Sequence, residues 1–188
     1  MARLNKTRYA LLGFLSMGPA SGYDIKIRME QSTEHFWKEG DASIYPILKQ
    51  LLQEKLVSLK MANTETSKPK KIYAITASGR KVLQAWLMKY PEPSQKRNEL
   101  LLKVFFGWNA VPTVTINHLK QFHQKTELTL NKYRSSTLAK KAASSKLTSA
   151  ELYRFLTLKA GIAYCETGLK WCEDVLHLLT TFNNKKGD

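Results

Sequence analysis

The residues with the clearest capacity for chemistry form a polar row between Ser43 and Val57. Tyr45, Lys49 and Gln53 are spaced four residues apart, so they share one face if this segment is a helix. An aromatic hydroxyl, a cation and an amide can contact base edges and phosphates, as a helix in the major groove of DNA must do. The same row would also suit an ordinary solvent-exposed helix face, and spacing alone favours neither interpretation.

A second group of cations follows in the sequence. Residues 57–61 and 72–75 are β-rich runs that flank a polar segment, which predicts a two-stranded hairpin with a long basic tip over residues 63–70. Three lysines lie at or beside this tip: Lys68, Lys70 and Lys71. Loop lysines are usually just solvated, but beside the polar row they would reach a minor groove or neighbouring phosphates. The two features together favour DNA binding.

Residue sets for catalysis or metal binding do not stand out. The four histidines are scattered: His35, His118, His123 and His177. None forms an HExxH motif, and the sequence has no glycine-rich phosphate loop or nucleophile elbow. Cys165 and Cys172 are seven residues apart and lack CxxC spacing, so we expect reduced core residues. We expect no enzyme activity, no metal site and no cofactor.

The elements that would position these residues are four helices and the hairpin. Apolar spacing predicts a helix over residues 3–17, and Ser21 is a good N-cap for a second helix. Ser43 is expected to cap the third helix. This would put Pro46 at position N3, where its missing N–H has no intrahelical acceptor to lose. Thr76 is expected to cap the fourth helix. This order is the plan of a winged helix-turn-helix.

The C-terminal half is predicted to be all helical. Helices are expected over residues 97–108, 114–143 and 149–182, and Thr148 and Glu151 form a capping box before the last one. Apolar residues of the last helix alternate at three- and four-residue spacing: Phe155, Leu158, Ile162, Cys165, Leu169, Cys172, Leu176 and Leu179. This pattern, here named the 155–179 stripe, is typical of a coiled coil and favours a homodimer. A buried helix in a monomeric bundle would give the same pattern.

Charge and composition are consistent with a polyanion partner. The 188 residues carry a formal net charge of +15, and 43% of them are hydrophobic, enough to build a core. We find no signal peptide at the start of the sequence and no apolar run long enough to span a membrane. We therefore expect a cytoplasmic protein without a membrane partner.

Three segments resemble, in order and spacing, the winged-helix domain of PadR-type transcriptional regulators: ALLGFLSMGPASGYDIKIRME, FWKEGDASIYPILKQLLQEKLV and KKIYAITASGRKVLQAWL. The SGYDI run, the IYP start of the third helix and the Y-x-I-T-x-x-G-R end of the wing carry the resemblance. The C-terminal half, through NELLLKVFF and FLTLKAG, is similar to the longer members of the family. These are related to the phenolic-acid decarboxylation repressor and the AphA-type virulence activators.

The resemblance implies a mainly α protein with two domains. Residues 1–91 would form a winged helix-turn-helix with a two-stranded wing, and residues 95–183 an all-α dimerisation and effector-binding domain with a coiled-coil-like helix. The homodimer would bind a palindromic operator in double-stranded DNA and usually repress a nearby gene. The implied DNA-binding residues are Tyr23, Ser43, Tyr45, Pro46, Lys49, Lys68, Lys70 and Lys71.

The resemblance also implies an effector. In the phenolic-acid members a small aromatic acid binds between the DNA-binding and C-terminal domains and releases the DNA. By its position in the last helix, Arg154 would pair with the carboxylate of such an acid, although a surface arginine would look the same.

Three other functions stay open on the sequence alone. An effector-independent architectural protein would bind DNA with little sequence preference and a steep dependence on salt. A multidrug-sensing regulator would share the fold but respond to a different ligand. A protein–protein adaptor would use the coiled coil and leave Tyr45 and Lys49 without a role in DNA binding. The sequence does not name the operator, the regulated gene or the effector, nor the sign of regulation.

Overall fold

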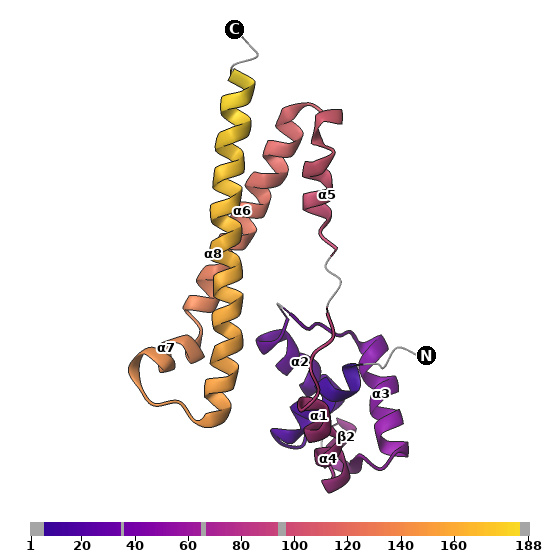
Figure 1. Ribbon diagram of the computed structural model, residues 1–188. Helices are drawn as coiled ribbons and strands as arrows, with labels where there is room; N and C mark the ends of the chain where they lie inside the picture. The colour runs from indigo at the N-terminus through magenta and orange to yellow at the C-terminus, as the bar shows by residue number, and fades with distance from the viewer. Residues whose placement is uncertain (1–5, 35, 65–66, 94–96, 185–188) are drawn as a thin grey trace. The chain divides into compact units, whose positions relative to one another are not determined.

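The computed structural model describes residues 6–34, 36–64, 67–93 and 97–184, with side chains left undescribed at 62–64, 67–69 and 183–184. The chain divides into two compact units, residues 1–93 and 94–188, and each is described by itself (Figure 1).

The described part of the N-terminal unit has the predicted order of helices and hairpin. The elements are α1 (Thr7–Ser16), α2 (Gly22–Ser32), α3 (Asp41–Gln53), β1 (Val57–Thr64), β2 (Ser67–Ile75) and α4 (Ala77–Leu87). The two strands form an antiparallel sheet, which is the wing. The prediction of a winged helix-turn-helix is therefore confirmed. The first helix begins at Thr7, and residues 3–5 of the predicted helix lie outside the described residues.

Apolar faces of α1, α2 and α3 form the core of this unit. The side chains with almost no exposed surface are Leu11, Leu12, Leu15, Ile25, Met29, Ile44, Leu48 and Leu51. Burying a side chain of this size stabilises the fold by about 1.5–3 kcal/mol, so this shared core holds α3 firmly. Tyr9 of α1 stacks on Trp86 of α4, with 4.8 Å between the ring centroids, and joins α4 to the same core.

The start of α3 differs from the prediction. Gly40, not Ser43, is the N-cap, and the helix begins at Asp41, whose negative charge is favourable in a first turn. The Ser43 N–H donates to the Gly40 carbonyl at 3.0 Å. Pro46 therefore lies inside the helix, and it leaves the Ala42 carbonyl without the usual partner four residues on. Both residues are exposed, so water can satisfy that carbonyl and the helix tolerates the proline.

The end of α3 is a Schellman motif. Lys55 has a positive φ of 57°, the left-handed conformation that glycine usually supplies at this position. The Lys55 N–H donates to the Leu52 carbonyl at 3.1 Å, and the Leu56 N–H donates to the Leu51 carbonyl at 2.9 Å. The motif ends α3 and directs the chain into β1.

The wing is more regular than predicted. Pairing runs from Val57 opposite Ile75 to Thr64 opposite Ser67, with an irregular register near Ala62. The predicted long loop over residues 63–70 is therefore wrong, because most of this segment is paired strand. Backbone pairing depends little on side-chain polarity, which is why a polar composition misled the prediction.

The start of α4 explains the glycine in the TASGR sequence. Thr76 is the N-cap, as predicted, and its Oγ1 accepts from the Gly79 N–H at 3.1 Å. The same hydroxyl lies 3.0 Å from the Leu56 carbonyl, to which it donates. A Cβ on Gly79 would lie 2.1 Å from the Leu56 carbonyl oxygen, so only glycine lets α4 approach the end of α3 this closely.

The described part of the C-terminal unit is helical, as predicted. Its elements are α5 (Glu99–Phe105), the 3-10 turn η1 (Gly107–Asn109), α6 (Pro112–Arg134), α7 (Thr137–Ser144) and α8 (Ser149–Asn184). One long helix over residues 114–143 was predicted, and this is wrong because the chain breaks between α6 and α7. Ser136 causes the break by capping α7: its Oγ accepts from the Ala139 N–H at 3.3 Å.

The capping box at the start of α8 is confirmed. A carboxylate oxygen of Glu151 accepts from the Thr148 N–H at 2.9 Å, and the Glu151 N–H donates to the Thr148 hydroxyl at 3.3 Å. Lys141 also bonds this carboxylate at 2.6 Å. The lysine and these cap bonds lower the pKa of Glu151 to about 2.

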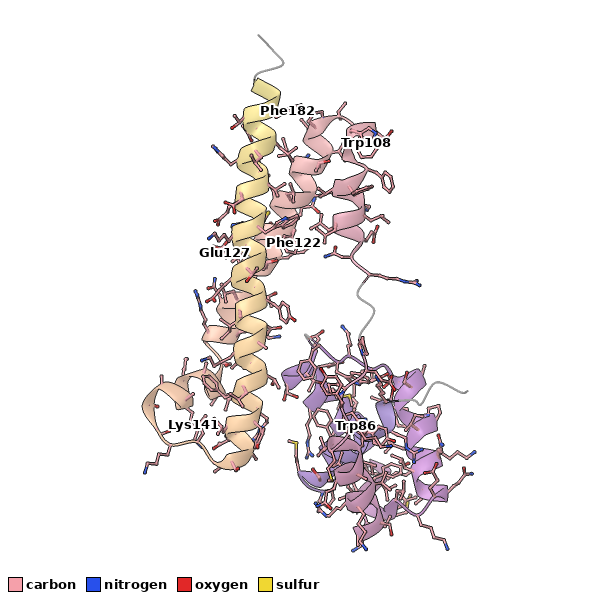
Figure 2. The ribbon with its side chains drawn as sticks, in the orientation of Figure 1. Trp86, Trp108, Phe122, Glu127, Lys141 and Phe182 are labelled. Atoms are coloured by element: carbon pink, nitrogen blue, oxygen red, sulfur yellow. The ribbon has the colours of Figure 1, made fainter. Side chains whose placement is uncertain are left out.

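Helix α8 packs along α6. The Cys172 thiol donates to the Leu119 carbonyl at 3.2 Å, and both residues are fully buried. Phe122 of α6 meets Trp171 edge to face, with 6.1 Å between the centroids, and lies against α8 in Figure 2. Gly168 leaves room for this ring, because a Cβ there would lie 3.3 Å from Phe122.

This packing defines the surroundings of the 155–179 stripe. Within the single chain Cys172 is buried, and the other seven members of the stripe are half-buried. Cys172 thus has no surface left for a partner. Another face of α8 carries large exposed apolar side chains: Leu152, Tyr153, Leu156, Tyr164, Leu178 and Phe182. In the described ranges, no helix is long and apolar enough to cross a membrane.

Candidate nucleic-acid interface

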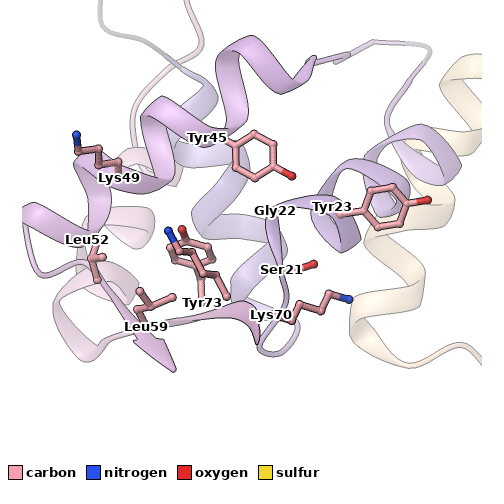
Figure 3. Close-up of a pocket in the computed structure, with 10 residues that line it drawn as sticks. Ser21, Gly22, Tyr23, Tyr45, Lys49, Leu52, Leu59, Lys70 and Tyr73 are labelled. Atoms are coloured by element: carbon pink, nitrogen blue, oxygen red, sulfur yellow. The ribbon is translucent and has the colours of Figure 1, made fainter. Parts of the chain in front are cut away.

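An open groove of about 710 Å³ lies on the N-terminal unit between α2, α3 and the wing (Figure 3). It is called the α2–α3–wing groove below. Its lining residues are Ser21, Gly22, Tyr23, Tyr45, Lys49, Leu52, Leu59, Lys70, Lys71 and Tyr73. Figure 3 shows Lys49 toward one end of the groove and Lys70 toward the other, with Tyr45 between them.

Five of the eight predicted DNA-binding residues line this groove: Tyr23, Tyr45, Lys49, Lys70 and Lys71. Ser43 and Pro46 do not. Ser43 precedes Tyr45 by two residues and so points about 200° away around the helix, at roughly 100° per residue. Pro46 is exposed on α3 outside the groove lining. Lys68 lies on β2, and its side chain is outside the part of the chain that the structure describes.

The exposed row on α3 is supported by its buried opposite face. Ile44, Leu48 and Leu51 anchor the helix in the core, which leaves Tyr45 and Lys49 on the open side. The Tyr45 side chain is 48% exposed, so its hydroxyl is free to meet a ligand while part of its ring is packed.

Gly22 provides the seat for the Tyr45 ring. A Cβ on Gly22 would lie 2.7 Å from Cε1 of Tyr45 and 3.3 Å from a methyl group of Leu48. Because the first turn of α2 carries no side chain here, the tyrosine can lie directly against its backbone. The position of Tyr45 is therefore set by α2 as much as by α3.

The wing is fixed to the segment that precedes α2. Ala20 and Tyr73 form an antiparallel bridge, with N–H to carbonyl distances of 3.0 and 2.9 Å. Tyr73 is buried at the base of the groove. Burial and the neighbouring Tyr45 raise the pKa of the Tyr73 phenol, which keeps it neutral at physiological pH.

Asp24 joins α2 to the wing by a charged contact. Its Oδ2 accepts from the Ser21 N–H at 3.0 Å and the Ser21 hydroxyl at 2.7 Å, and the Asp24 N–H returns a bond to that hydroxyl. Its Oδ1 accepts from Lys70 Nζ at 3.0 Å. The Ser21 hydroxyl, the Ser21 N–H and Lys70 together lower the pKa of Asp24 to about 2, so the carboxylate stays ionised.

The groove is suited to a polyanion. Of its lining residues three are lysines and none is acidic, and two tyrosine hydroxyls stand among the cations. Such a surface can contact phosphates through the lysines and base edges or sugars through the tyrosines. Within the described ranges, no group of three or more histidine, cysteine or acidic side chains could hold a metal ion.

Sequence reasoning missed several residues of this site. Asp24 had a readable signal, because Ser21 and Asp24 have the spacing of a capping box, although nothing in the sequence indicated its contact with Lys70. Leu59 and Tyr73 lie opposite each other in the wing, and only the strand register brings them to the groove.

The predicted effector residue lies in the C-terminal unit. Arg154 is exposed on the second turn of α8, and its Nε donates to the Ala150 carbonyl of the same helix at 3.2 Å. Its role in binding an acid stays a prediction.

Two family profiles cover most of the chain. Residues 11–85 match the transcriptional regulator PadR-like family, and residues 96–180 match the virulence activator alpha C-terminal family. The fold and the basic groove define a transcription regulator of the winged-helix class. The chain belongs to the PadR-like family of transcriptional regulators, in which it carries the C-terminal helical region of the longer members.

Proteins of known structure support this assignment. The chain is 28% identical to the negative transcriptional regulator PadR of Bacillus subtilis over 92% of this chain and 96% of that protein. A crystal structure of that PadR with operator DNA matches with a TM-score of 0.85, at 26% identity over 94% of this chain and 99% of that one. Its complex with p-coumaric acid matches with a TM-score of 0.74, at 26% identity over 92% and 98%.

The virulence activator AphA of Vibrio cholerae shares the fold. Its TM-score is 0.70, at 22% identity over 93% of this chain and 98% of that one. The resemblance to the family, including its longer members, is thus confirmed by sequence and by fold.

Proposed function

We propose that this protein is a homodimeric transcriptional regulator that binds operator DNA through the α2–α3–wing groove and represses a nearby gene. The observation that carries the proposal is the convergence of Tyr45 and Lys49 from α3 with Lys70 and Lys71 from the wing on one open surface. The complex of B. subtilis PadR with operator DNA supports the same use of the fold.

In this proposal α3 enters the major groove. Tyr45 and Lys49 face outward near the start of the helix, the part that reaches deepest in helix-turn-helix proteins. Lys70 and Lys71 contact phosphates or the adjacent minor groove. Tyr23, Ser43, Pro46 and Lys68, also predicted to contact DNA, would lie around this centre.

The dimer is proposed to form through the C-terminal unit. Tyr164 and Phe182 are eighteen residues apart, five full turns, so they lie on one face of α8, and Leu178 lies near them. All three are more than half exposed in the single chain. A monomer rarely leaves so many large apolar side chains in water, which favours a second copy over them. A palindromic operator would follow from the two-fold symmetry of such a dimer.

We also propose that a small aromatic acid releases the DNA. The support is the complex of B. subtilis PadR with p-coumaric acid, and the description of that protein as a negative regulator. Arg154 is the proposed partner of the carboxylate. A regulator that senses other drug-like molecules is the alternative, and the thermal stability of the protein with p-coumarate and with unrelated aromatic cations distinguishes them.

The DNA-binding proposal is tested with the full-length protein. A duplex is selected from a random-sequence pool, and its affinity is compared with that of a scrambled duplex by fluorescence anisotropy at fixed salt. We expect Tyr45→Ala and Lys49→Ala each to weaken binding to the selected duplex by about tenfold, within the range of one lost base contact.

Lys60→Ala is the matched control for these variants. Lys60 is exposed on β1 and alternates with Leu59, so it lies on the face of the strand away from the groove. A wild-type protein that binds both duplexes equally would indicate an architectural DNA-binding protein. Equal losses for Lys49→Ala and Lys60→Ala would contradict the use of this groove.

A further inference from the structure

The three lysines of the α2–α3–wing groove are not equivalent. Lys70 is paired with Asp24, with 3.0 Å between Nζ and Oδ1. In the described part of the chain, neither Lys49 nor Lys71 forms an ion pair with an acid. One of the cations that faces the proposed DNA is therefore already neutralised by the protein.

Asp24 cannot follow Lys70 when the lysine moves. Its other carboxylate oxygen is held by the backbone N–H and the hydroxyl of Ser21, which itself is almost fully buried. The carboxylate is thus fixed at the first turn of α2. To reach a phosphate elsewhere, Lys70 must leave Asp24, and the carboxylate is then left facing the DNA.

The pair is open to exchange with a phosphate. The side chains of Lys70 and Asp24 are 45% and 34% exposed, and Lys70 lines the groove (Figure 3). A phosphate held close to Lys70 can compete with the carboxylate for its N–H donors. A phosphate held at a distance gains little from Lys70 and is repelled by Asp24.

We propose that Asp24 is a specificity-determining residue that restrains Lys70, so that this lysine engages a phosphate only where the bound DNA fits closely enough to displace the carboxylate. The inference rests on the proposed DNA-binding function. Generic DNA, bound loosely, would meet two free groove lysines and one neutralised one, whereas the operator would engage all three. Asp24 would thereby lower the affinity for generic DNA more than the affinity for the operator.

The test measures the salt dependence of binding for the full-length protein and four variants. Affinities for the selected and the scrambled duplex are measured by fluorescence anisotropy over a range of NaCl concentrations. The variants are Asp24→Asn, Lys70→Gln, the double variant and Glu34→Gln. Asparagine keeps an oxygen that can accept from Ser21, so the cap of α2 is retained while the charge is lost.

We expect Asp24→Asn to tighten binding to the scrambled duplex by about three- to tenfold at low salt. It should also steepen the slope of log affinity against log salt by about 0.9, the value for one additional phosphate contact. The selected duplex should gain less, so discrimination between the two duplexes falls. With Lys70→Gln already present, Asp24→Asn should leave the slope unchanged.

Glu34→Gln is the matched control for net charge. Glu34 also pairs with a lysine, Lys38, at 2.9 Å, but it lies beyond the C-terminal end of α2, away from the groove. It should leave the slope and the discrimination unchanged. A change equal to that of Asp24→Asn would overturn the proposal, because net charge alone would then explain the effect.

Other outcomes separate the proposal from its rivals. If Asp24→Asn weakens both duplexes equally, or leaves the slope of the scrambled duplex unchanged, Asp24 only supports the fold and the proposal is wrong. If Asp24→Asn does not fold, Lys70→Gln and Lys71→Gln decide. On scrambled DNA the loss of Lys70 should then cost clearly less than the loss of Lys71, and equal costs would overturn the proposal.

The same data separate this inference from the proposed function. A wild-type protein that does not prefer the selected duplex overturns both. A wild-type protein that discriminates, with an Asp24→Asn variant that behaves identically, overturns only the role of Asp24.

Discussion

The two units of the chain use their apolar residues in opposite ways. In the described part of the N-terminal unit sixteen apolar residues are buried, whereas in that of the C-terminal unit only Leu119, Leu130 and Cys172 are. The C-terminal unit instead exposes large apolar side chains on α5, α6 and α8, among them Phe105, Trp108 and Phe182. The N-terminal unit is a complete core with a functional surface, and the C-terminal unit is an incomplete core.

This difference teaches where a partner is needed. The α2–α3–wing groove is built wholly from one chain, so the N-terminal unit needs no second copy to shape it. The long helix α8 has one covered face, against α6, and another that is bare. Covering that face is the simplest way for the C-terminal unit to reach the burial that the N-terminal unit already has.

The strongest way to break the N-terminal core is at Gly79. Gly79→Ala should destabilise the protein by about 2–4 kcal/mol, because the new Cβ would lie 2.1 Å from the Leu56 carbonyl oxygen. Gly13→Ala is the control. No atom lies within 4 Å of a Cβ there, and alanine in the middle of α1 should stabilise by about 0.5–1 kcal/mol. Urea unfolding measures both, and equal effects would contradict the close approach of α4.

The C-terminal unit is tested at its bare face. Leu178→Glu should weaken the proposed dimer by at least tenfold, about 1.4 kcal/mol, because a charge would be buried at the interface. Leu87→Glu in α4 is the control, since Leu87 and Leu178 are each 66% exposed. Light scattering over a dilution series measures dimer mass. A dimer that survives Leu178→Glu unchanged would argue against this face of α8.

The seat of Tyr45 is tested by Gly22→Ala. The added methyl would lie 2.7 Å from the tyrosine ring, so the ring must move and the groove changes shape. We expect about a tenfold loss of affinity for the selected duplex, comparable to Tyr45→Ala, without a change in dimer mass. Combining the two substitutions should add little, because both act on the same ring. Fully additive losses would mean that Gly22 acts independently of Tyr45.

The Asp24 contact gives the N-terminal unit a pH dependence. Its pKa is lowered from 3.8 to about 2, so the contact adds stability above pH 3.8 that is lost as the pH falls toward 2. The side chain is 34% exposed, so solvent screening limits this contribution to about 1 kcal/mol. Asp24→Asn should flatten this part of the curve of unfolding free energy against pH. An unchanged curve would show that other carboxylates cause the acid transition.

The smallest expected effect is at the end of α3. Lys55→Gly should stabilise the N-terminal unit by about 0.5 kcal/mol, because glycine removes the strain of a positive φ but loses more entropy on folding. Urea unfolding measures this, with Lys60→Gly in the strand β1 as a control that should destabilise. Destabilisation by Lys55→Gly would mean that the lysine side chain itself contributes to the fold.

The sequence predicted features that depend on local spacing. The buried face of α3 was predicted correctly because Ile44, Leu48 and Leu51 recur at helical intervals. The caps at Ser21 and Thr76 follow from side chains that bond backbone N–H groups within the next turn. These features need no knowledge of the rest of the chain.

The errors arose where local signals competed or contacts were distant. Ser43 and Gly40 both suit an N-cap, and the serine attracted the prediction although the helix begins after the glycine. The seat of Tyr45 on Gly22 and the contact of Asp24 with Lys70 join residues far apart in sequence. Spacing could therefore identify the cations of the site but not the restraint on one of them.

The bridge between Ala20 and Tyr73 has a consequence for the order of folding. The helices α1, α2 and α3 follow one another closely, so their contacts close short loops, whereas the bridge must close a loop of more than fifty residues. Contacts of such long range tend to form late. We therefore expect the helical core to be protected from hydrogen exchange before the Ala20 and Tyr73 amides are. The groove that meets DNA would then be the last part of this unit to be assembled.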